Sequence, residues 1–150
     1  RFLERLGRTV QEVQVKPELE IFDIGMLYAA EHYMGRGILK APCHFQFILG
    51  APGGVAATVE DLLTLKQRLP PGSTWAASGI GKGHVPIMLA TIALGGHLRV
   101  GMEDNVFYHR GIPAASNAQL VERAVRLLGE AGLQAASPDD ARRILGIGRR

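Results

Sequence analysis

The chain has 150 residues, of which 47% are hydrophobic and 21% charged, a composition typical of one globular domain and not of a disordered or fibrous protein. Its net charge of +3 is spread along the sequence, so we expect no nucleic-acid partner. Cys43 is the single cysteine, which excludes an internal disulfide and a cysteine-only metal cluster, and we interpret it as a buried structural residue. No apolar run reaches the roughly 20 residues of a membrane span, and no secretory signal is visible, so we expect a cytoplasmic protein without a membrane partner.

The predicted elements alternate between strand and helix along the chain. We predict a first helix at 1–10, four strands at 18–23, 44–50, 74–80 and 97–103, and further helices at 24–37, 58–69, 84–94, 116–132 and 137–147. Thr58 is a candidate N-cap with Asp61 three residues on, and Ser137-Pro138 has the residues of a helix start. Because strands alternate with helices, the pattern predicts a parallel sheet with helical crossovers.

Each predicted strand has one polar and one apolar face. Strands of an open sheet covered by helices on both faces are apolar throughout, whereas polar side chains that converge on one side describe the interior of a barrel. Four strand–helix units are half of a (β/α)₈ barrel. The sequence therefore predicts an α/β protein of the TIM-barrel class, with residues 1–150 forming the carboxyl-terminal half of one domain, strands five to eight. The opening residue Arg1 reads as mid-helix, which fits a piece of a longer protein.

The last predicted strand carries the most informative charges. Arg99 and Glu103 share its polar face, and Asp104 begins the following loop. Of two adjacent carboxylates, one can hold a metal while the other moves a proton, and an arginine can stabilise a carboxylate or a developing oxyanion. The alternative is a structural ion pair of Arg99 with either of these acids, or with Glu18 or Glu20 on the first strand, and both interpretations can hold at once.

Two glycine-rich loops follow the second and third strands. Backbone amides near Gly53 and Gly81 can approach a phosphate, and Lys82 can contact one or form a Schiff base. Ordinary turn chemistry is the alternative for both loops. The five histidines lack the spacing of zinc ligands, so we interpret them as structural.

Five motifs in the same order resemble the β-keto acid cleavage enzymes, which include the 3-keto-5-aminohexanoate cleavage enzymes of lysine fermentation. They are KPELEIFDIG (16–25), HFQFILGAPGG (44–54), TWAASGIGKG (74–83), LGGHLRVGMEDN (94–105) and SNAQLVERAVRL (116–127). The resemblance implies a TIM barrel with a divalent metal, usually zinc, that converts a β-keto acid and acetyl-CoA into acetoacetate and a CoA ester. It also implies a homo-oligomer of the full-length protein.

The resemblance assigns roles to residues of this chain. It implies that Glu103 is a metal ligand, joined by two histidines of an H-x-H motif that this sequence does not contain. Arg99 and Asp104 match catalytic positions, Asp104 for acid–base chemistry and Arg99 for stabilising negative charge, with Glu20 as a partner of Arg99.

The same resemblance places the loops of Gly53, Gly81 and Lys82 at the mouth where CoA enters. Two other interpretations stay open at this point: a phosphate-binding or Schiff-base barrel enzyme that uses Lys82, and an inactive barrel fragment.

Overall fold

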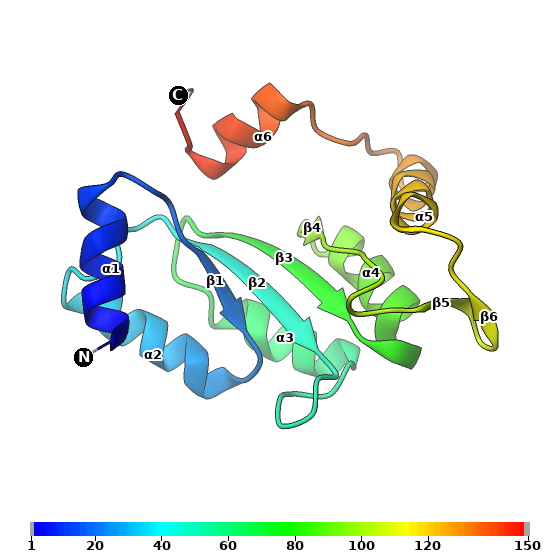
Figure 1. Ribbon diagram of the computed structural model, residues 1–150, viewed down its shortest axis with the longest axis horizontal. Helices are drawn as coiled ribbons and strands as arrows, with labels where there is room; N and C mark the ends of the chain where they lie inside the picture. Colours follow the sequence, from blue (N-terminus) through cyan, green and yellow to red (C-terminus); the bar gives the residue numbers. More distant parts are fainter. Residues whose placement is uncertain (1, 149–150) are drawn as a thin grey trace.

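The computed structural model describes residues 2–148 (Figure 1). The first residue of the predicted amino-terminal helix, Arg1, and the tail arginines Arg149 and Arg150 lie outside the described residues. Within 2–148, no helix is both long and apolar enough to cross a membrane.

A four-stranded parallel sheet forms the centre of the structure. Its strands are β1 (Glu18–Ile21), β2 (His44–Leu49), β3 (Thr74–Gly79) and β4 (His97–Leu98), and they lie side by side in chain order. Glu18 of β1 pairs with His44 of β2, which in turn pairs with Thr74 of β3. The α/β fold and the parallel strands confirm the prediction from the alternating pattern.

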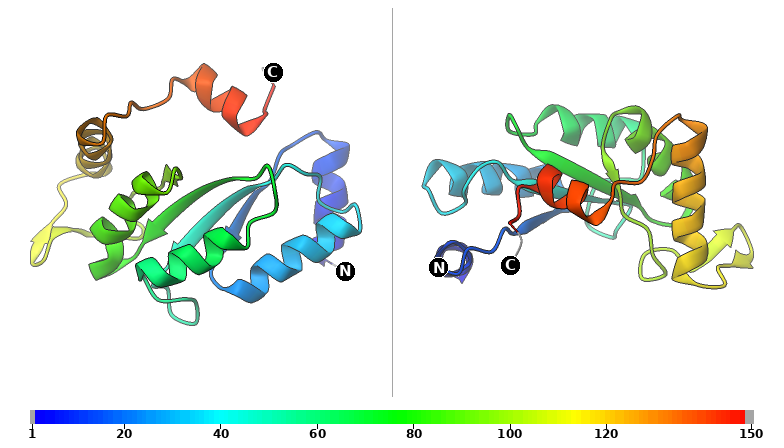
Figure 2. Two further views of the ribbon diagram at one scale, coloured as in Figure 1. Left: turned by 180° about the vertical axis from the view of Figure 1, so that it is seen from behind. Right: turned by 90° about the horizontal axis from the view of Figure 1, so that it is seen from above.

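Residues 2–148 also form six α-helices and one short 3₁₀-helix. They are α1 (Phe2–Glu12), α2 (Ile24–Gly35), α3 (Val59–Gln67), η1 (Gly81–Gly83), α4 (His84–Ala93), α5 (Asn117–Glu130) and α6 (Pro138–Leu145). The caps predicted at Thr58 and Ser137 are confirmed, since their side chains accept hydrogen bonds from amides in the first turns of α3 and α6. The side chain of Ser116 caps α5 in the same way. Figure 2 shows α2, α3 and α4 on one side of the sheet and α6 on the other.

The apolar core lies between the sheet and helices α2 to α4. Phe45, Phe47 and Leu49 of β2 are completely buried there, together with Leu62 of α3 and Ile87 of α4. Burying each such side chain contributes about 1.5–3 kcal/mol, so this face fixes the register of the strands. The residues between these apolar ones in each strand therefore point to the opposite face of the sheet, as the pattern of one polar and one apolar face predicts.

The second face of the sheet is polar. Gln46 of β2 and Ser78 of β3 are buried on it, and His44 lies at its amino-terminal end with Nδ1 2.8 Å from the Thr74 hydroxyl. Helix α6 covers this end, held by a 2.6 Å hydrogen bond from Lys16 Nζ to the Leu145 carbonyl. The polar face stays accessible toward the carboxyl ends of the strands.

The prediction of a strand over 97–103 is wrong, because β4 contains only His97 and Leu98. The Arg99 amide still donates to the Ala77 carbonyl at 3.2 Å, but residues 102–104 then form a turn. The Asn105 amide closes this turn with a 3.0 Å hydrogen bond to the Gly101 carbonyl. Glu103 and Asp104 therefore lie on a turn, whereas Arg99 directly follows β4, so the three do not share one strand face.

A hairpin that the pattern does not predict follows this turn. Strands β5 (Phe107–His109) and β6 (Ile112–Pro113) pair antiparallel, and the hairpin is anchored to α5 by Arg123. The Arg123 guanidinium lies 3.4 Å from the centroid of the Tyr108 ring and donates to the Tyr108 carbonyl at 2.5 Å. These contacts hold the hairpin beyond the carboxyl end of β3.

Candidate functional site

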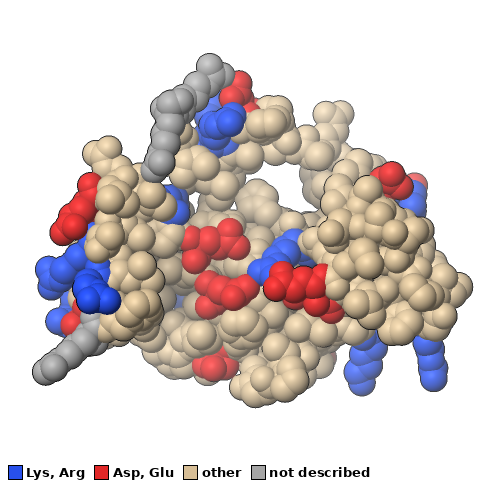
Figure 3. All heavy atoms as spheres, in the orientation of Figure 1, with Lys and Arg blue, Asp and Glu red and all other residues tan. Residues whose placement is uncertain are grey.

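Arg99 is the centre of a cluster of charged side chains on the polar face of the sheet. Its Nη1 lies 2.6 Å from Glu20 Oε1, its Nε 3.3 Å from Asp104 Oδ2 and its Nη2 3.4 Å from Glu103 Oε2. Figure 3 shows the acidic side chains gathered around basic atoms in the middle of this face. The structure thus brings together the four residues that the sequence singles out on the first and last strands.

The local fold explains how these four side chains meet. Glu20 occupies the polar side of β1 in the alternating register, and the turn at 102–104 directs the two later acids back toward Arg99. Asp104 is the more enclosed of the two, with a side chain that is 11% exposed, whereas the Glu103 side chain is 86% exposed. Three of the ion pairs considered for Arg99 in the sequence are therefore formed, with Glu20, Glu103 and Asp104.

The electrostatics of the cluster keep the arginine charged. Burial acts to lower the pKa of Arg99, but the hydrogen bond to Glu20 and the charges of Asp104, Glu20 and Glu103 outweigh it and raise this pKa. Three carboxylates surround this one guanidinium, so the cluster carries an excess of negative charge.

Two residues that the sequence analysis did not assign to the site also contact the cluster or its loop. Ser78 donates its hydroxyl to Asp104 Oδ2 at 3.1 Å. Asn105 is 4% exposed; its Nδ2 donates to the Gly79 carbonyl at 2.9 Å and its Oδ1 accepts from the Gly81 amide at 2.8 Å. Ser78 was detectable as the polar residue nearest the carboxyl end of β3, and Asn105 as the neighbour of Asp104.

The two glycine-rich loops lie beside each other at the carboxyl ends of β2 and β3. Gly83 approaches Ala57 so closely that a Cβ on Gly83 would lie 2.2 Å from the Ala57 Cβ. Gly81 and Lys82 line the same cavity as Asp104, while Gly53 lies on an exposed turn outside that cavity. Lys82 is exposed to solvent, an environment unlike the apolar pocket that activates a Schiff-base lysine.

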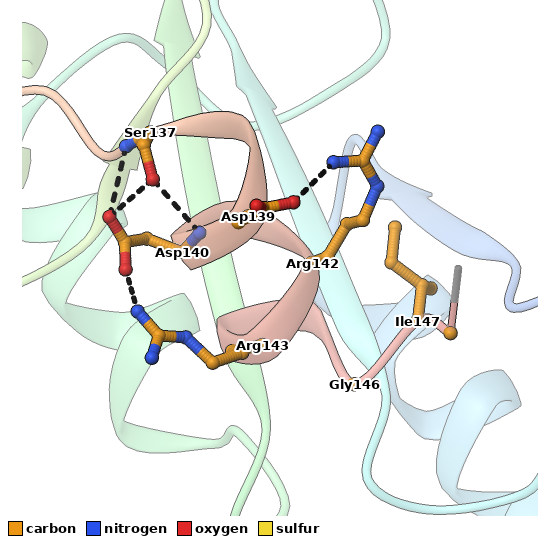
Figure 4. A pocket seen from close by; sticks show the side chains of 8 residues that line it. Ser137, Asp139, Asp140, Arg142, Arg143, Gly146 and Ile147 are labelled. Atoms are coloured by element: carbon orange, nitrogen blue, oxygen red, sulfur yellow. Dashed lines mark hydrogen bonds and ion pairs between the residues drawn. The ribbon is translucent and has the colours of Figure 1, made fainter.

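A second hollow lies beside α6 and is a poor candidate for a site. Figure 4 shows its lining, in which Arg142 pairs with Asp139 at 3.0 Å and Arg143 pairs with Asp140. The Ser137 hydroxyl contacts Asp140 in the capping box that starts the helix. These groups stabilise the helix itself, since each acid lies three residues before its arginine.

Within residues 2–148, no three histidine, cysteine, aspartate or glutamate side chains gather in a way that could hold a metal ion. His44 and His97 lie at the amino-terminal end of the sheet with ring centroids 6.3 Å apart, away from the charged cluster. Cys43 is buried, and burial raises the pKa of its thiol, which agrees with a structural role. A metal ligand set that includes Glu103 thus requires further ligands from outside the described residues.

The sequence is similar to known proteins over almost its full length. The family described as beta-keto acid cleavage enzyme matches residues 1–147. A 3-keto-5-aminohexanoate cleavage enzyme of Fusobacterium nucleatum is 43% identical over 97% of this chain and 53% of its own length. The enzyme of the same name from Acetoanaerobium sticklandii is 44% identical over 90% of this chain and 50% of its own.

A more distant relative, a 3-oxoadipate:acetyl-CoA acetyltransferase of Cupriavidus necator, is 34% identical over 95% of this chain and 51% of its own length. The chain thus spans about half the length of the curated relatives it matches, all three of which are named as enzymes. The family resemblance of the five sequence motifs is confirmed, and the chain belongs to the beta-keto acid cleavage enzyme family.

Proposed function

We propose that the full-length protein containing this chain cleaves a β-keto acid in a reaction with acetyl-CoA, yielding acetoacetate and a CoA ester. The names of the relatives support β-keto acid cleavage and acetyl-CoA-dependent transfer. The observation that carries the proposal is the convergence of Glu20, Arg99, Glu103 and Asp104 on one polar face, toward the carboxyl ends of parallel strands. Ligands of parallel α/β folds bind at this end of the strands.

We further propose that residues 1–150 are the carboxyl-terminal half of a TIM barrel, strands five to eight. The strands lie in chain order, helices α2 to α4 cover one face, and the polar face lies on the side that a barrel encloses. In the described chain β1 and β4 are the outer strands, and each has one edge at which a further strand can pair.

We assign Glu103 as this chain's ligand to a divalent metal, which we expect to be zinc. The negative charge of the cluster and the exposed Glu103 carboxylate fit a divalent cation as a partner. When bound, such an ion supplies positive charge that polarises a keto oxygen. The remaining ligands would come from the other half of the protein.

We assign acid–base catalysis to Asp104 and the stabilisation of negative charge to Arg99. Both contacts that hold the Asp104 side chain, from Ser78 and from Arg99, use Oδ2, so we assign proton transfer to Oδ1. The Arg99 guanidinium would face negative charge that develops on the substrate oxygens as the acyl group moves. Glu20 holds the guanidinium in place through Nη1.

The proposal includes the binding of acetyl-CoA at the loops of Gly53, Gly81 and Lys82. Gly81 and Lys82 line a cavity that Asp104 also lines, which supports their assignment more directly than that of Gly53.

We also expect a cytoplasmic homo-oligomer, and a role in lysine fermentation if the substrate is that of the relatives with 43% and 44% identity. Size-exclusion chromatography with light scattering tests the oligomer.

The decisive experiment assays the purified full-length protein with acetyl-CoA and a panel of β-keto acids, following acetoacetate by NMR. We expect turnover that falls by about 10²-fold or more in Asp104→Asn, while Arg68→Gln at the C-cap of α3 keeps normal activity. Metal analysis provides a second test, because Glu103→Ala should lower the bound metal while Glu18→Ala on the same sheet face should not. Absence of acetoacetate with every acid, or an unchanged Asp104→Asn rate, would contradict the proposal.

A further inference from the structure

A cavity of about 730 Å³ lies on the side of the sheet where β3 ends. Three segments enclose it: η1 with the first turn of α4, residues 104–106, and the hairpin of β5 and β6 (Figure 1). Among the described residues, its lining contains the basic side chains Lys82, His84, His109 and Arg110, and Asp104 is its one carboxylate. Because Arg99 and Ser78 already contact that acid, the cavity is available to an anion.

His84 is the most informative residue of this lining. It is 5% exposed, and its Nε2 is buried without a hydrogen-bond partner among the described residues. Burial first, and then the charge of Arg123, lower the pKa of His84, while Asp104 acts to raise it. A buried polar nitrogen without a partner is costly, so its position at this cavity indicates a group that a ligand completes.

The surroundings of His84 add positive potential. It occupies the first turn of α4, where the partial positive charge of the helix N-terminus is greatest. Arg123 lies behind the hairpin and is 3% exposed, and its Nη1 is also buried without a partner among the described residues. No carboxylate of residues 2–148 forms an ion pair with Arg123, so its charge acts on the region of the hairpin uncompensated.

We propose that this cavity binds the phosphate groups of the acyl-CoA substrate. The inference rests on the proposed function, and it deepens that function by assigning His84, His109 and Arg110 to the phosphorylated end of the ligand. A volume of about 730 Å³ lies within the range of small-molecule sites. Since Asp104 borders both the cavity and the charged cluster, one ligand can place phosphates at the hairpin and its thioester at the cluster.

The test compares ligands that share the thiol arm but differ in phosphate. Isothermal titration of the full-length protein measures the dissociation constants of CoA, of pantetheine, which lacks every phosphate, and of ADP. We expect CoA to bind at least about a hundredfold more tightly than pantetheine, and ADP to bind detectably. Arg110→Gln and His84→Gln should each weaken CoA binding about tenfold and leave pantetheine binding unchanged.

Arg110 lies on the exposed turn of the hairpin, so its variant should fold even if a change at buried His84 does not. Arg68→Gln, which removes an equal charge from the C-cap of α3 outside the cavity, should change neither affinity. Equal losses for CoA and pantetheine, or normal CoA binding in Arg110→Gln, would refute the assignment. A protein that cleaves β-keto acids but shows no preference for CoA over pantetheine would refute only this inference. Selective CoA binding without cleavage would retain it and refute the proposed reaction.

Discussion

Asn105 provides a quantitative test of how the loop of the candidate site is held. Replacing Asn105 by alanine removes the hydrogen bonds of 2.9 Å to the Gly79 carbonyl and 2.8 Å to the Gly81 amide. Each such bond contributes about 0.5–1.5 kcal/mol net, and leaving the two backbone groups without partners adds to the loss. We therefore expect Asn105→Ala to lower the free energy of unfolding by about 2–3 kcal/mol.

Urea titration of the full-length protein measures this change, with Asn117→Ala as the matched control. Asn117 also accepts a backbone hydrogen bond, from the Met102 amide at 2.7 Å, but it is exposed, so water can replace the lost partner. The control should lose about 0.5–1 kcal/mol. Asn105→Asp keeps an acceptor for the Gly81 amide but turns an oxygen toward the Gly79 carbonyl. Its free energy of unfolding should therefore decrease by about as much as that of Asn105→Ala. Equal losses at Asn105 and Asn117 would refute the reasoning.

Further expectations concern the guanidinium, the close packing of the loops and the response to pH. Arg99→Lys keeps the charge but loses the planar fork, so kcat should fall by about 10²-fold with a smaller change in KM, measured by steady-state assay. Gly83→Ala brings a Cβ within 2.2 Å of the Ala57 Cβ and should cost about 1–3 kcal/mol in urea titration. Gly129→Ala, in open space on α5, should instead gain about 0.5–1 kcal/mol. Burial lowers the pKa of His84 from its ordinary 6.5, so the unfolded chain binds this proton more readily than the folded chain. The free energy of unfolding should therefore decrease as the pH falls below about 6.5. Urea titrations at about pH 7 and about pH 5.5 measure this decrease, which His84→Gln should make smaller.

The sheet was predictable because the alternation of polar and apolar residues along its strands follows directly from which face is buried. Phe45, Phe47 and Leu49 occupy alternate positions of β2 and pack against the helices, while Gln46 between them lies on the polar face. The helix starts were predictable for a similar local reason, since a cap such as Thr58 bonds an amide three residues away. Signals that depend on neighbours in sequence were therefore sufficient for this part of the fold.

The end of β4 was not predictable from alternation, because a side chain ends it. The Asn105 side chain donates from Nδ2 to the Gly79 carbonyl and accepts at Oδ1 from the Gly81 amide. These backbone groups lie just beyond the stretch of β3 that pairs with β4. Such competition by a side chain does not appear in a polar–apolar pattern. The resulting turn places Glu103 Oε2 3.4 Å from Arg99 Nη2, although an extended strand would separate these residues by about 13 Å.

The sequence was sufficient to predict which charged residues meet at the candidate site, but not how exposed each side chain is. The charges on the first and last predicted strands mark Glu20, Arg99, Glu103 and Asp104, and the structure joins all four. Their sequence does not reveal that Asp104 is enclosed by Ser78 while Glu103 faces solvent. That difference depends on the turn, and it underlies our separate assignments of proton transfer and metal binding.

The contact between Glu20 and Arg99 also bears on the shape of the sheet. These residues are 79 positions apart in the sequence, and β2 and β3 lie between their strands. In a flat sheet, strands three spacings apart are separated by about 14 Å, and side chains that stand perpendicular to the sheet do not meet over that distance. An ion pair of 2.6 Å therefore favours a sheet that curves toward its polar face. A sheet that curves in this direction, with helices on its outer face, supports the proposal that these strands form one half of a closed barrel around the charged cluster.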